Sequence, residues 1–241
     1  MKKVFFTLIF AIFFVCEAWA NEDVSRYIED CLAVIDKPNI KAKSSYGYLR
    51  YNFDKDEDFL RKKTSELYNE RGAKLPDNHM VLGLTVVKLG FELDVGVGII
   101  GITKDKYCVY PTDIDAYIGY SAPVIYILKD LQKGSCKYDV ALKHEKTHME
   151  IYINSLDYFL PKFKELVENL LQDVGVRIVD KPKDDQSRLV VAKKFSEVYR
   201  DYVKKQVDEW WNIVLKVEQG KLDTMENYDL ESRICREIDK E

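Results

Sequence analysis

The strongest constraint on the fold of this chain is a pair of histidines, His144 and His148, with three residues between them. Side chains four positions apart lie on one face of an α-helix, so both imidazoles reach the same point only if this segment is helical. Apolar residues around the pair recur at helical spacing, and Ser135 is a suitable N-cap for a helix that starts near Cys136. We therefore predict a long helix from about Cys136, which Pro161 ends or kinks.

The residue between the histidines with the clearest chemical role is Glu145. Two imidazoles at this spacing can hold one Zn²⁺ ion, and a carboxylate beside them can take a proton from the water that the metal activates. The chain contains only three histidines, so a chance occurrence of this pattern is rare. The alternative is a pair of solvated histidines that form charge pairs with Glu145 and Glu150. We favour a catalytic zinc site in which His144 and His148 bind the metal and Glu145 is the general base.

A catalytic zinc ion usually has three protein ligands, so the third must come from elsewhere in the chain. Position 154, where one common pattern has another histidine, is Asn154, and the remaining histidine, His79, is a weaker candidate at the start of a predicted strand. Carboxylates are better candidates, and three groups of them compete: Glu165 and Glu168; Glu197, Asp201, Asp208 and Glu209; and Asp223, Glu226, Asp229 and Glu231. The residues alone do not choose among these groups.

Residues 1–20 have the pattern of a secretory signal. Two lysines precede an apolar run from Val4 to Val15, and Ala18-Trp19-Ala20 fits a cleavage site. The apolar run is short for a membrane span, and no later segment is as apolar. We expect cleavage after Ala20 and a periplasmic or secreted protein that is not stably inserted in a membrane. An uncleaved N-terminal anchor is the alternative.

An even number of cysteines would remain after cleavage: Cys31, Cys108, Cys136 and Cys235. In an exported protein, such a count predicts two disulfides, for which three pairings are possible. We favour Cys31–Cys108 and Cys136–Cys235, because each of these bonds would tie a terminal segment to a more central one. The second bond would hold the tail beside the start of the histidine-bearing helix, where Glu226 and Tyr228 could reach the metal.

The pattern of apolar residues predicts an α+β fold: an N-terminal antiparallel β-sheet with one helix, followed by a C-terminal half of long helices that carries the metal-binding motif. We treat residues 21–241 as one zincin-like hydrolase domain, with a β-rich subdomain over 21–134 and a helical subdomain over 135–241. A second long helix is expected from about 187 to 217, followed by a polar tail. The expected strands are 40–53, 81–94, 97–110 and 116–128, the expected helix is 56–71, and turns are expected at Gly96 and Gly98 and at Pro111.

The net charge of the chain indicates whether a nucleic acid is a suitable partner. The formal net charge is −4 at pH 7, whereas a protein that binds nucleic acid needs a basic surface. We therefore expect no nucleic-acid partner. The chain also has no Gly-rich phosphate loop and no redox C-x-x-C motif.

The segment from Cys136 to His148 resembles a group of bacterial secreted proteins described as predicted zinc-dependent proteases, whose function is otherwise uncharacterised. Those proteins carry a cysteine shortly before an H-E-x-x-H helix, and many end with an Asp-Thr, acidic, Tyr motif and a cysteine. Residues 222–228 followed by Cys235 look similar. The resemblance implies a gluzincin-like site, supports the Cys136–Cys235 bond, and suggests Glu226 as third zinc ligand. It also makes Tyr228 either a hydrogen-bond donor to the transition state or a packed aromatic residue.

Three functions fit these observations. The first is a zinc metallopeptidase acting on a peptide or protein, with residues 116–128 as an edge strand to which an extended substrate could pair. The second is a non-catalytic envelope or secreted binding protein, with or without a structural metal, whose 16 tyrosines and Trp210-Trp211 pair would serve a partner surface. The third is a zinc amidase that acts on cell-wall peptides. The substrate and the oligomeric state are left open.

Overall fold

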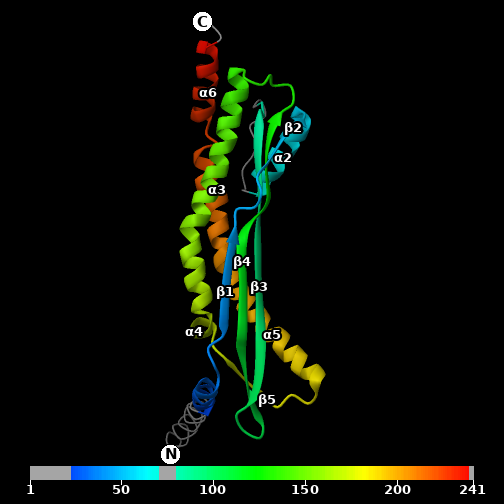
Figure 1. The fold of residues 1–241 in the computed structure, drawn as a ribbon, viewed down its shortest axis with the longest axis vertical. Helices are drawn as coiled ribbons and strands as arrows, with labels where there is room; N and C mark the ends of the chain where they lie inside the picture. Colours follow the sequence, from blue (N-terminus) through cyan, green and yellow to red (C-terminus); the bar gives the residue numbers. More distant parts are fainter. Residues whose placement is uncertain (1–22, 71–79, 239–241) are drawn as a thin grey trace, which may run out of the picture. The chain divides into compact units, whose positions relative to one another are not determined.

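A computed structural model of the protein describes residues 23–70 and 80–238. The predicted signal segment and His79 lie outside the described residues. The fold class is mixed α+β, as predicted: strands dominate the N-terminal half of the chain and long helices the C-terminal half (Figure 1).

The elements follow one another in this order: a helix over residues 23–34, β1 (Asn39–Ser45), β2 (Arg50–Lys55), α2 (Glu57–Glu70), β3 (Gly83–Gly101), β4 (Lys106–Leu128), α3 (Cys136–Glu168), α4 (Leu170–Val174), β5 (Arg177–Asp180), α5 (Asp185–Ile213), a π-helical turn (Val214–Glu218), a 3₁₀ turn (Gln219–Lys221) and α6 (Met225–Ile238).

The described residues form two compact units, and both are discontinuous in sequence. The first unit comprises residues 23–42, 93–116 and 166–203. The second unit comprises residues 43–70, 80–92, 117–165 and 204–238. The division at residue 134 suggested by the sequence separates types of secondary structure, and the compact units cut across it.

In the first unit, β5 pairs with the beginning of β4 in antiparallel fashion, with Lys106 opposite Asp180. A disulfide joins Cys31 to Cys108, and both side chains are buried against Val176. This bond is one of the two pairings favoured from the sequence. It ties the helix over residues 23–34 to β4.

In the second unit, β2 runs parallel to the end of β4, with Arg50 opposite Val124. An antiparallel sheet was predicted, and this pair departs from that prediction. The chain returns from β2 to β4 through α2 and β3 rather than through a hairpin, and such a connection allows parallel pairing. The side of α2 packs on the sheet through a cluster of buried residues: Leu60, Val81, Leu84 and Leu128.

The paired tryptophans also belong to the second unit. Trp210 is buried and stacks on Phe159, with ring centroids 4.4 Å apart. Trp211 stacks on Tyr152 at 5.6 Å. These rings pack α5 against α3, with Trp210 buried and Trp211 partly buried.

Strand β4 is the central strand of the sheet. Among the described residues, each of the other four strands pairs with β4. The prediction that residues 116–128 form an edge strand is therefore wrong, because their backbone is already engaged by neighbouring strands.

The turns predicted inside the sheet are also wrong. Gly96 and Gly98 lie within the continuous strand β3, and Pro111 lies within β4. A side chain at Gly96 would meet the hydroxyl of Thr112 at 2.8 Å, and one at Gly98 would collide with the ring of Tyr110. These glycines allow close packing across the strands. The reversal occurs instead at residues 102–105, where Ile102 N–H donates to the carbonyl of Lys106 at 2.9 Å.

Two further differences concern the first strand and the C-terminal tail. The strand predicted over 40–53 is two strands, separated by a segment in which Gly47 has a φ of +71°. The tail predicted to be merely polar forms helix α6, whose start is capped by Thr224: its hydroxyl accepts the N–H of Asn227 at 3.2 Å.

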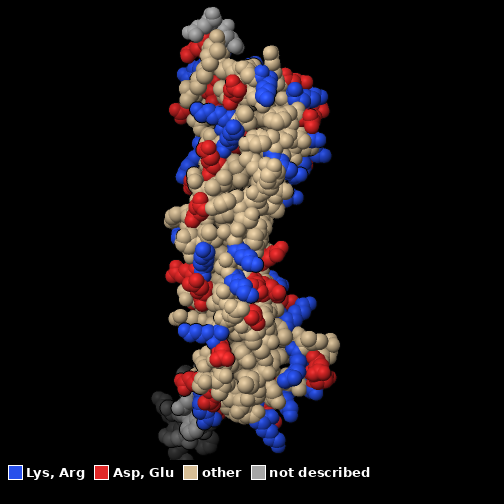
Figure 2. All heavy atoms as spheres, viewed as in Figure 1, with Lys and Arg blue, Asp and Glu red and all other residues tan. Residues whose placement is uncertain are grey.

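On the face shown in Figure 2, acidic and basic side chains are interspersed rather than gathered by sign. Within residues 23–70 and 80–238, no helix combines the length and apolar character needed to cross a bilayer. The two disulfides are compatible with an extracytoplasmic location.

Candidate metal site

Helix α3 presents both histidines to the interior of the second unit. Ser135 caps the helix as predicted, because its hydroxyl accepts the N–H of Tyr138 at 3.3 Å. Pro161 does not end the helix, which continues to Glu168. Phe159 and Phe163, on either side of the proline, are both buried, and their packing offsets the backbone hydrogen bond that Pro161 cannot make.

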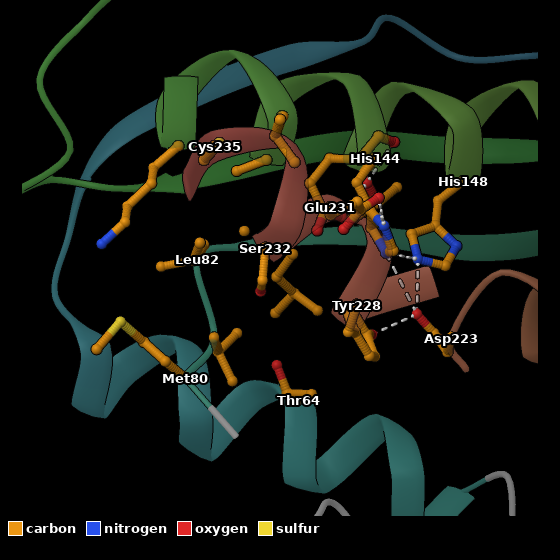
Figure 3. A pocket seen from close by; sticks show the side chains of 18 of the residues that line it. Thr64, Met80, Leu82, His144, His148, Asp223, Tyr228, Glu231, Ser232 and Cys235 are labelled. Atoms are coloured by element: carbon orange, nitrogen blue, oxygen red, sulfur yellow. Dashed lines mark hydrogen bonds and ion pairs between the residues drawn. The ribbon is translucent and has the colours of Figure 1, made fainter. Parts of the chain in front are cut away.

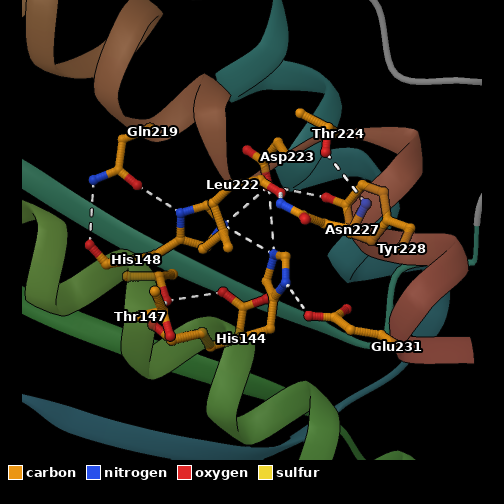
Figure 4. A network of polar contacts seen from close by, with 12 residues as sticks. His144, Thr147, His148, Gln219, Leu222, Asp223, Thr224, Asn227, Tyr228 and Glu231 are labelled. Atoms are coloured by element: carbon orange, nitrogen blue, oxygen red, sulfur yellow. Dashed lines mark hydrogen bonds and ion pairs between the residues drawn. The ribbon is translucent and has the colours of Figure 1, made fainter. Parts of the chain in front are cut away.

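Three ligand-type atoms converge where α3 meets the segment before α6 (Figure 4). Nε2 of His144 lies 3.2 Å from Nε2 of His148. Oδ1 of Asp223 lies 3.0 Å from Nε2 of His148 and 3.5 Å from Nε2 of His144. All three side chains are at most 10% exposed. These residues form what we call the metal group: His144, His148 and Asp223.

The outer nitrogen of each imidazole faces an acceptor. Nδ1 of His144 lies 2.9 Å from Oε1 of Glu231, and Nδ1 of His148 lies 2.5 Å from Oε1 of Gln219. The amide nitrogen of Gln219 donates to the carbonyl of His148 at 3.2 Å, which fixes which end of the amide faces the ring. Both Nδ1 atoms therefore carry hydrogen, and in the neutral rings both Nε2 lone pairs point into the metal group.

This arrangement fits a metal ion. Zinc holds nitrogen and oxygen ligands at about 2.0–2.2 Å, and two such ligands at a tetrahedral angle are about 3.4 Å apart. The three separations in the metal group, 3.0 to 3.5 Å, match that spacing. With neutral rings, both Nε2 lone pairs and the Asp223 carboxylate face the same point, so a positive charge, either a proton or a metal ion, is needed between them. Outer partners of the kind seen here are the usual companions of metal-binding histidines.

The electrostatics of His144 agree with this need. Burial lowers the pKa of its imidazole, but hydrogen bonds with Asp223 and Glu231 outweigh burial and raise the pKa to about 10. The acidic surroundings of this ring therefore favour a positive charge at the metal group, whether a proton or a metal ion carries it.

The carboxylate of Asp223 reaches the metal group because the chain leaves α5 through two irregular turns. The helix passes into a π-helical turn and then a 3₁₀ turn that begins at Gln219. π-helical turns occur often at functional sites because they shift the side chains that follow. Asp223 then lies just before the cap of α6, outside the helix, and its side chain turns back toward α3 (Figure 4).

The C-terminal helix is held in place by a disulfide. Cys136, the first residue of α3, is bonded to Cys235 in α6, and the two Cα atoms are 5.4 Å apart. This is the second pairing favoured from the sequence, and it is confirmed. As expected, the bond keeps the tail beside the histidine-bearing helix.

The structure does not bring Glu226 to the histidines. Glu226 is exposed on the first turn of α6, whereas Asp223 precedes the helix and faces the metal group. The carboxylate that the structure places beside the two histidines is that of Asp223, three residues before the predicted Glu226. Glu231, from the same competing group, contacts His144 from outside. His79 lies outside the described residues.

Glu145 is buried beside the metal group. The hydroxyl of Thr85 in β3 lies 2.8 Å from both Oε2 and the backbone carbonyl oxygen of Glu145, and its one hydrogen can be donated to either. Gly83 leaves room for the same side chain, since a Cβ there would lie 2.6 Å from Cγ of Glu145. Burial raises the pKa of Glu145, although the nearby histidines oppose that rise. A carboxylate with a raised pKa is a better proton acceptor.

Tyr228 packs against the metal group from α6. Its ring stacks on His144, with centroids 5.3 Å apart, and its hydroxyl donates to Oδ1 of Asp223 at 2.9 Å. Burial and the neighbouring Asp223 raise the pKa of Tyr228, so the phenol keeps its proton. Tyr228 is therefore both a packed ring and a hydrogen-bond donor to the third member of the group.

A cavity of about 530 Å³ opens beside these residues within the second unit. All three members of the metal group line it, together with Glu145 and Tyr228. The remaining lining comes from α2, the start of β3, the first turns of α3 and the end of α6. A ligand in the cavity would therefore meet the metal group and Glu145 at the same time.

Four supporting residues were not foreseen: Gly83, Thr85, Gln219 and, in its outer role, Glu231. Gln219 comes directly after the π-helical turn that ends α5, and no local sequence pattern predicts such a turn. Gly83 and Thr85 are far from Glu145 in the sequence, so their contacts with it form only when β3 packs against α3. Asp223 was among the competing carboxylates, and the Cys235 bond was the signal that pointed to its part of the tail.

Comparison of the chain with protein-family models, curated proteins and solved structures found no match in any of the three.

Proposed function

We propose that this protein is a zinc-dependent peptidase whose metal is held by His144, His148 and Asp223. The observation that supports this most directly is the triangle of two Nε2 atoms and one carboxylate oxygen, buried at the wall of a cavity beside Glu145. Two imidazoles and a carboxylate are a common ligand set for catalytic zinc. Three protein ligands leave the fourth tetrahedral position open, as catalysis requires.

When bound, zinc would supply Lewis acidity, which lowers the pKa of water and polarises a substrate carbonyl. The chain's own residues supply the proton transfers. The carboxylate of Glu145, held beside the Thr85 hydroxyl, would take the proton of the attacking water. The same carboxylate would then give that proton to the leaving nitrogen of the peptide bond. The raised pKa of Glu145 suits both steps.

The remaining contacts hold the ligands in place. Gln219 and Glu231 accept hydrogen bonds from the outer nitrogens of the imidazoles and keep their Nε2 lone pairs directed inward. Tyr228 orients the carboxylate of Asp223. Such outer contacts stiffen a metal site and make its ligands more basic.

The experiment compares Glu145→Gln with the wild-type protein and with Glu150→Gln, an exposed glutamate on the same helix. Zinc content and hydrolysis of a mixed peptide library are measured for each protein. We expect about one zinc per chain in all three, and a loss of hydrolysis by about 10²- to 10⁴-fold only in Glu145→Gln.

Two results would overturn the proposal. The first is hydrolysis by Glu145→Gln at the wild-type rate. The second is the absence of metal from wild-type protein purified without chelators, which would instead favour the non-catalytic binding protein. Cleavage of cell-wall peptides alone, with no activity on the library, would point to the amidase.

A further inference from the structure

The cavity beside the metal group has two ends of different character. Figure 3 shows His144, His148 and Asp223 at one end, and Met80 and Leu82 toward the other. The wall away from the metal group is mainly apolar and includes Leu67, Met80, Val81, Leu82, Leu84 and Val140. Cavities of this size, apolar with a few placed polar groups, are typical of ligand sites.

One polar group in the wall has no partner. Thr64, on α2, is 7% exposed, and its Oγ1 is the one buried side-chain oxygen or nitrogen without a hydrogen-bond partner in the described part of the chain. Figure 3 shows the Thr64 side chain directed from α2 toward the cavity. A buried hydroxyl without a partner is unfavourable, and a ligand that offers an amide group would relieve it.

We propose that this cavity holds a bulky apolar side chain of a peptide, next to the bond that is cut, and that the Thr64 hydroxyl hydrogen-bonds to the peptide backbone beside it. The inference rests on the proposed peptidase function and names its substrate class. The basic residues Lys137 and Arg236 also line the cavity, both exposed, so an acidic side chain is the competing occupant.

The test uses zinc-loaded protein and short peptide hydroxamates, in which the hydroxamate binds zinc and one neighbouring side chain varies. Glycine, leucine, phenylalanine and aspartate versions are titrated by calorimetry. Burial of a leucine or phenylalanine side chain should tighten binding by about tenfold or more over glycine and aspartate.

The variant Leu82→Trp fills the apolar end of the cavity. It should remove the preference for leucine and phenylalanine while leaving zinc content and the affinity of the glycine compound unchanged. The matched control is Leu189→Trp, at an exposed leucine of α5, which should keep the full preference.

The variant Thr64→Val keeps the shape of the side chain and removes its hydroxyl. We expect it to weaken every hydroxamate by a similar factor of several-fold and to leave the melting temperature of the ligand-free protein unchanged or higher. A purely structural hydroxyl would show the reverse: a lower melting temperature and unchanged affinities.

Equal affinity for all four hydroxamates, tighter binding of the aspartate compound, or no binding of any of them would overturn the inference. Failure of the proposed function has a separate signature. Leucine peptides without a hydroxamate are titrated against zinc-free protein. If they bind the wild-type protein and bind Leu82→Trp more weakly, the cavity takes an apolar side chain as inferred. If zinc is neither bound nor required in that case, the peptidase proposal fails.

Discussion

Nδ1 of His148 lies 2.5 Å from Oε1 of Gln219, and the amide nitrogen of the same glutamine donates to the backbone carbonyl of His148. This two-point contact fixes both the ring and the amide. Gln219 is fully buried, so no water competes for these hydrogen bonds. The contact makes Gln219 a positioning residue for His148.

Gln219→Leu keeps the side-chain volume and removes both hydrogen bonds. We expect zinc affinity, measured by competition with a chelator, to fall by about 10- to 100-fold, as for other outer contacts of metal ligands. Gln219→Glu retains the acceptor and should recover much of the loss. Gln132→Leu, at an exposed glutamine, serves as control. An affinity within twofold of wild type in Gln219→Leu would contradict the role.

Alanine substitutions at Asp223 and at Glu226 can show which of the two carboxylates binds the metal. Asp223→Ala removes one of the three converging ligand atoms, so the protein should no longer retain zinc through gel filtration. Glu226→Ala changes an exposed side chain on the first turn of α6 and should retain about one equivalent. Elemental analysis of both variants decides the matter, and the opposite pattern would restore Glu226 as the third ligand.

Gly83 controls the space available to Glu145. In Gly83→Ala, the new methyl group would lie 2.6 Å from Cγ of Glu145, so the carboxylate must move. We expect kcat to fall by about tenfold or more with zinc content unchanged, because misplacement of a catalytic group by about 1 Å has large kinetic effects. Gly90→Ala, on the same strand, makes only an ordinary 3.4 Å contact and should leave kcat unchanged. Equal kcat in both variants would show that Glu145 tolerates the methyl group.

The two disulfides should differ in their effect on the metal. Replacing Cys136 and Cys235 by serine frees α6, which carries the outer partners of His144, and should lower both stability and zinc affinity. Replacing Cys31 and Cys108 acts in the first unit and should lower stability alone. Loss of a native disulfide costs about 2–5 kcal/mol. Thermal melts with and without zinc measure both effects, and an equal loss of zinc-dependent stabilisation in the two double variants would contradict the distinction.

The parts of this molecule that sequence predicts well are those set by local rules. The helix carrying His144 and His148 follows from periodicity and from the cap at Ser135. The cysteine count predicted two disulfides, and of the three possible pairings the favoured one is confirmed. Glu145 lies beside the two histidines, as its position on the same helix predicts, and its role as general base stays a prediction.

The parts that sequence misses depend on contacts between distant segments. Gly96 and Gly98 have the composition of a turn, yet their lack of a side chain serves the packing of Thr112 and Tyr110 on the neighbouring strand. Asp223 and Glu226 are both acidic residues of the same tail, and only the exact residue at which α6 begins decides which one faces the histidines.

His148 and Asp223 are separated by 75 positions in the chain. During synthesis, the histidine pair is complete long before the carboxylate that joins it, and the disulfide that secures α6 needs Cys235, which comes later still. A metal ion that binds the nascent chain before Asp223 is made would have only two protein ligands and a low affinity. Under the proposed function, metal loading would therefore be a late event that follows the folding of the last helix.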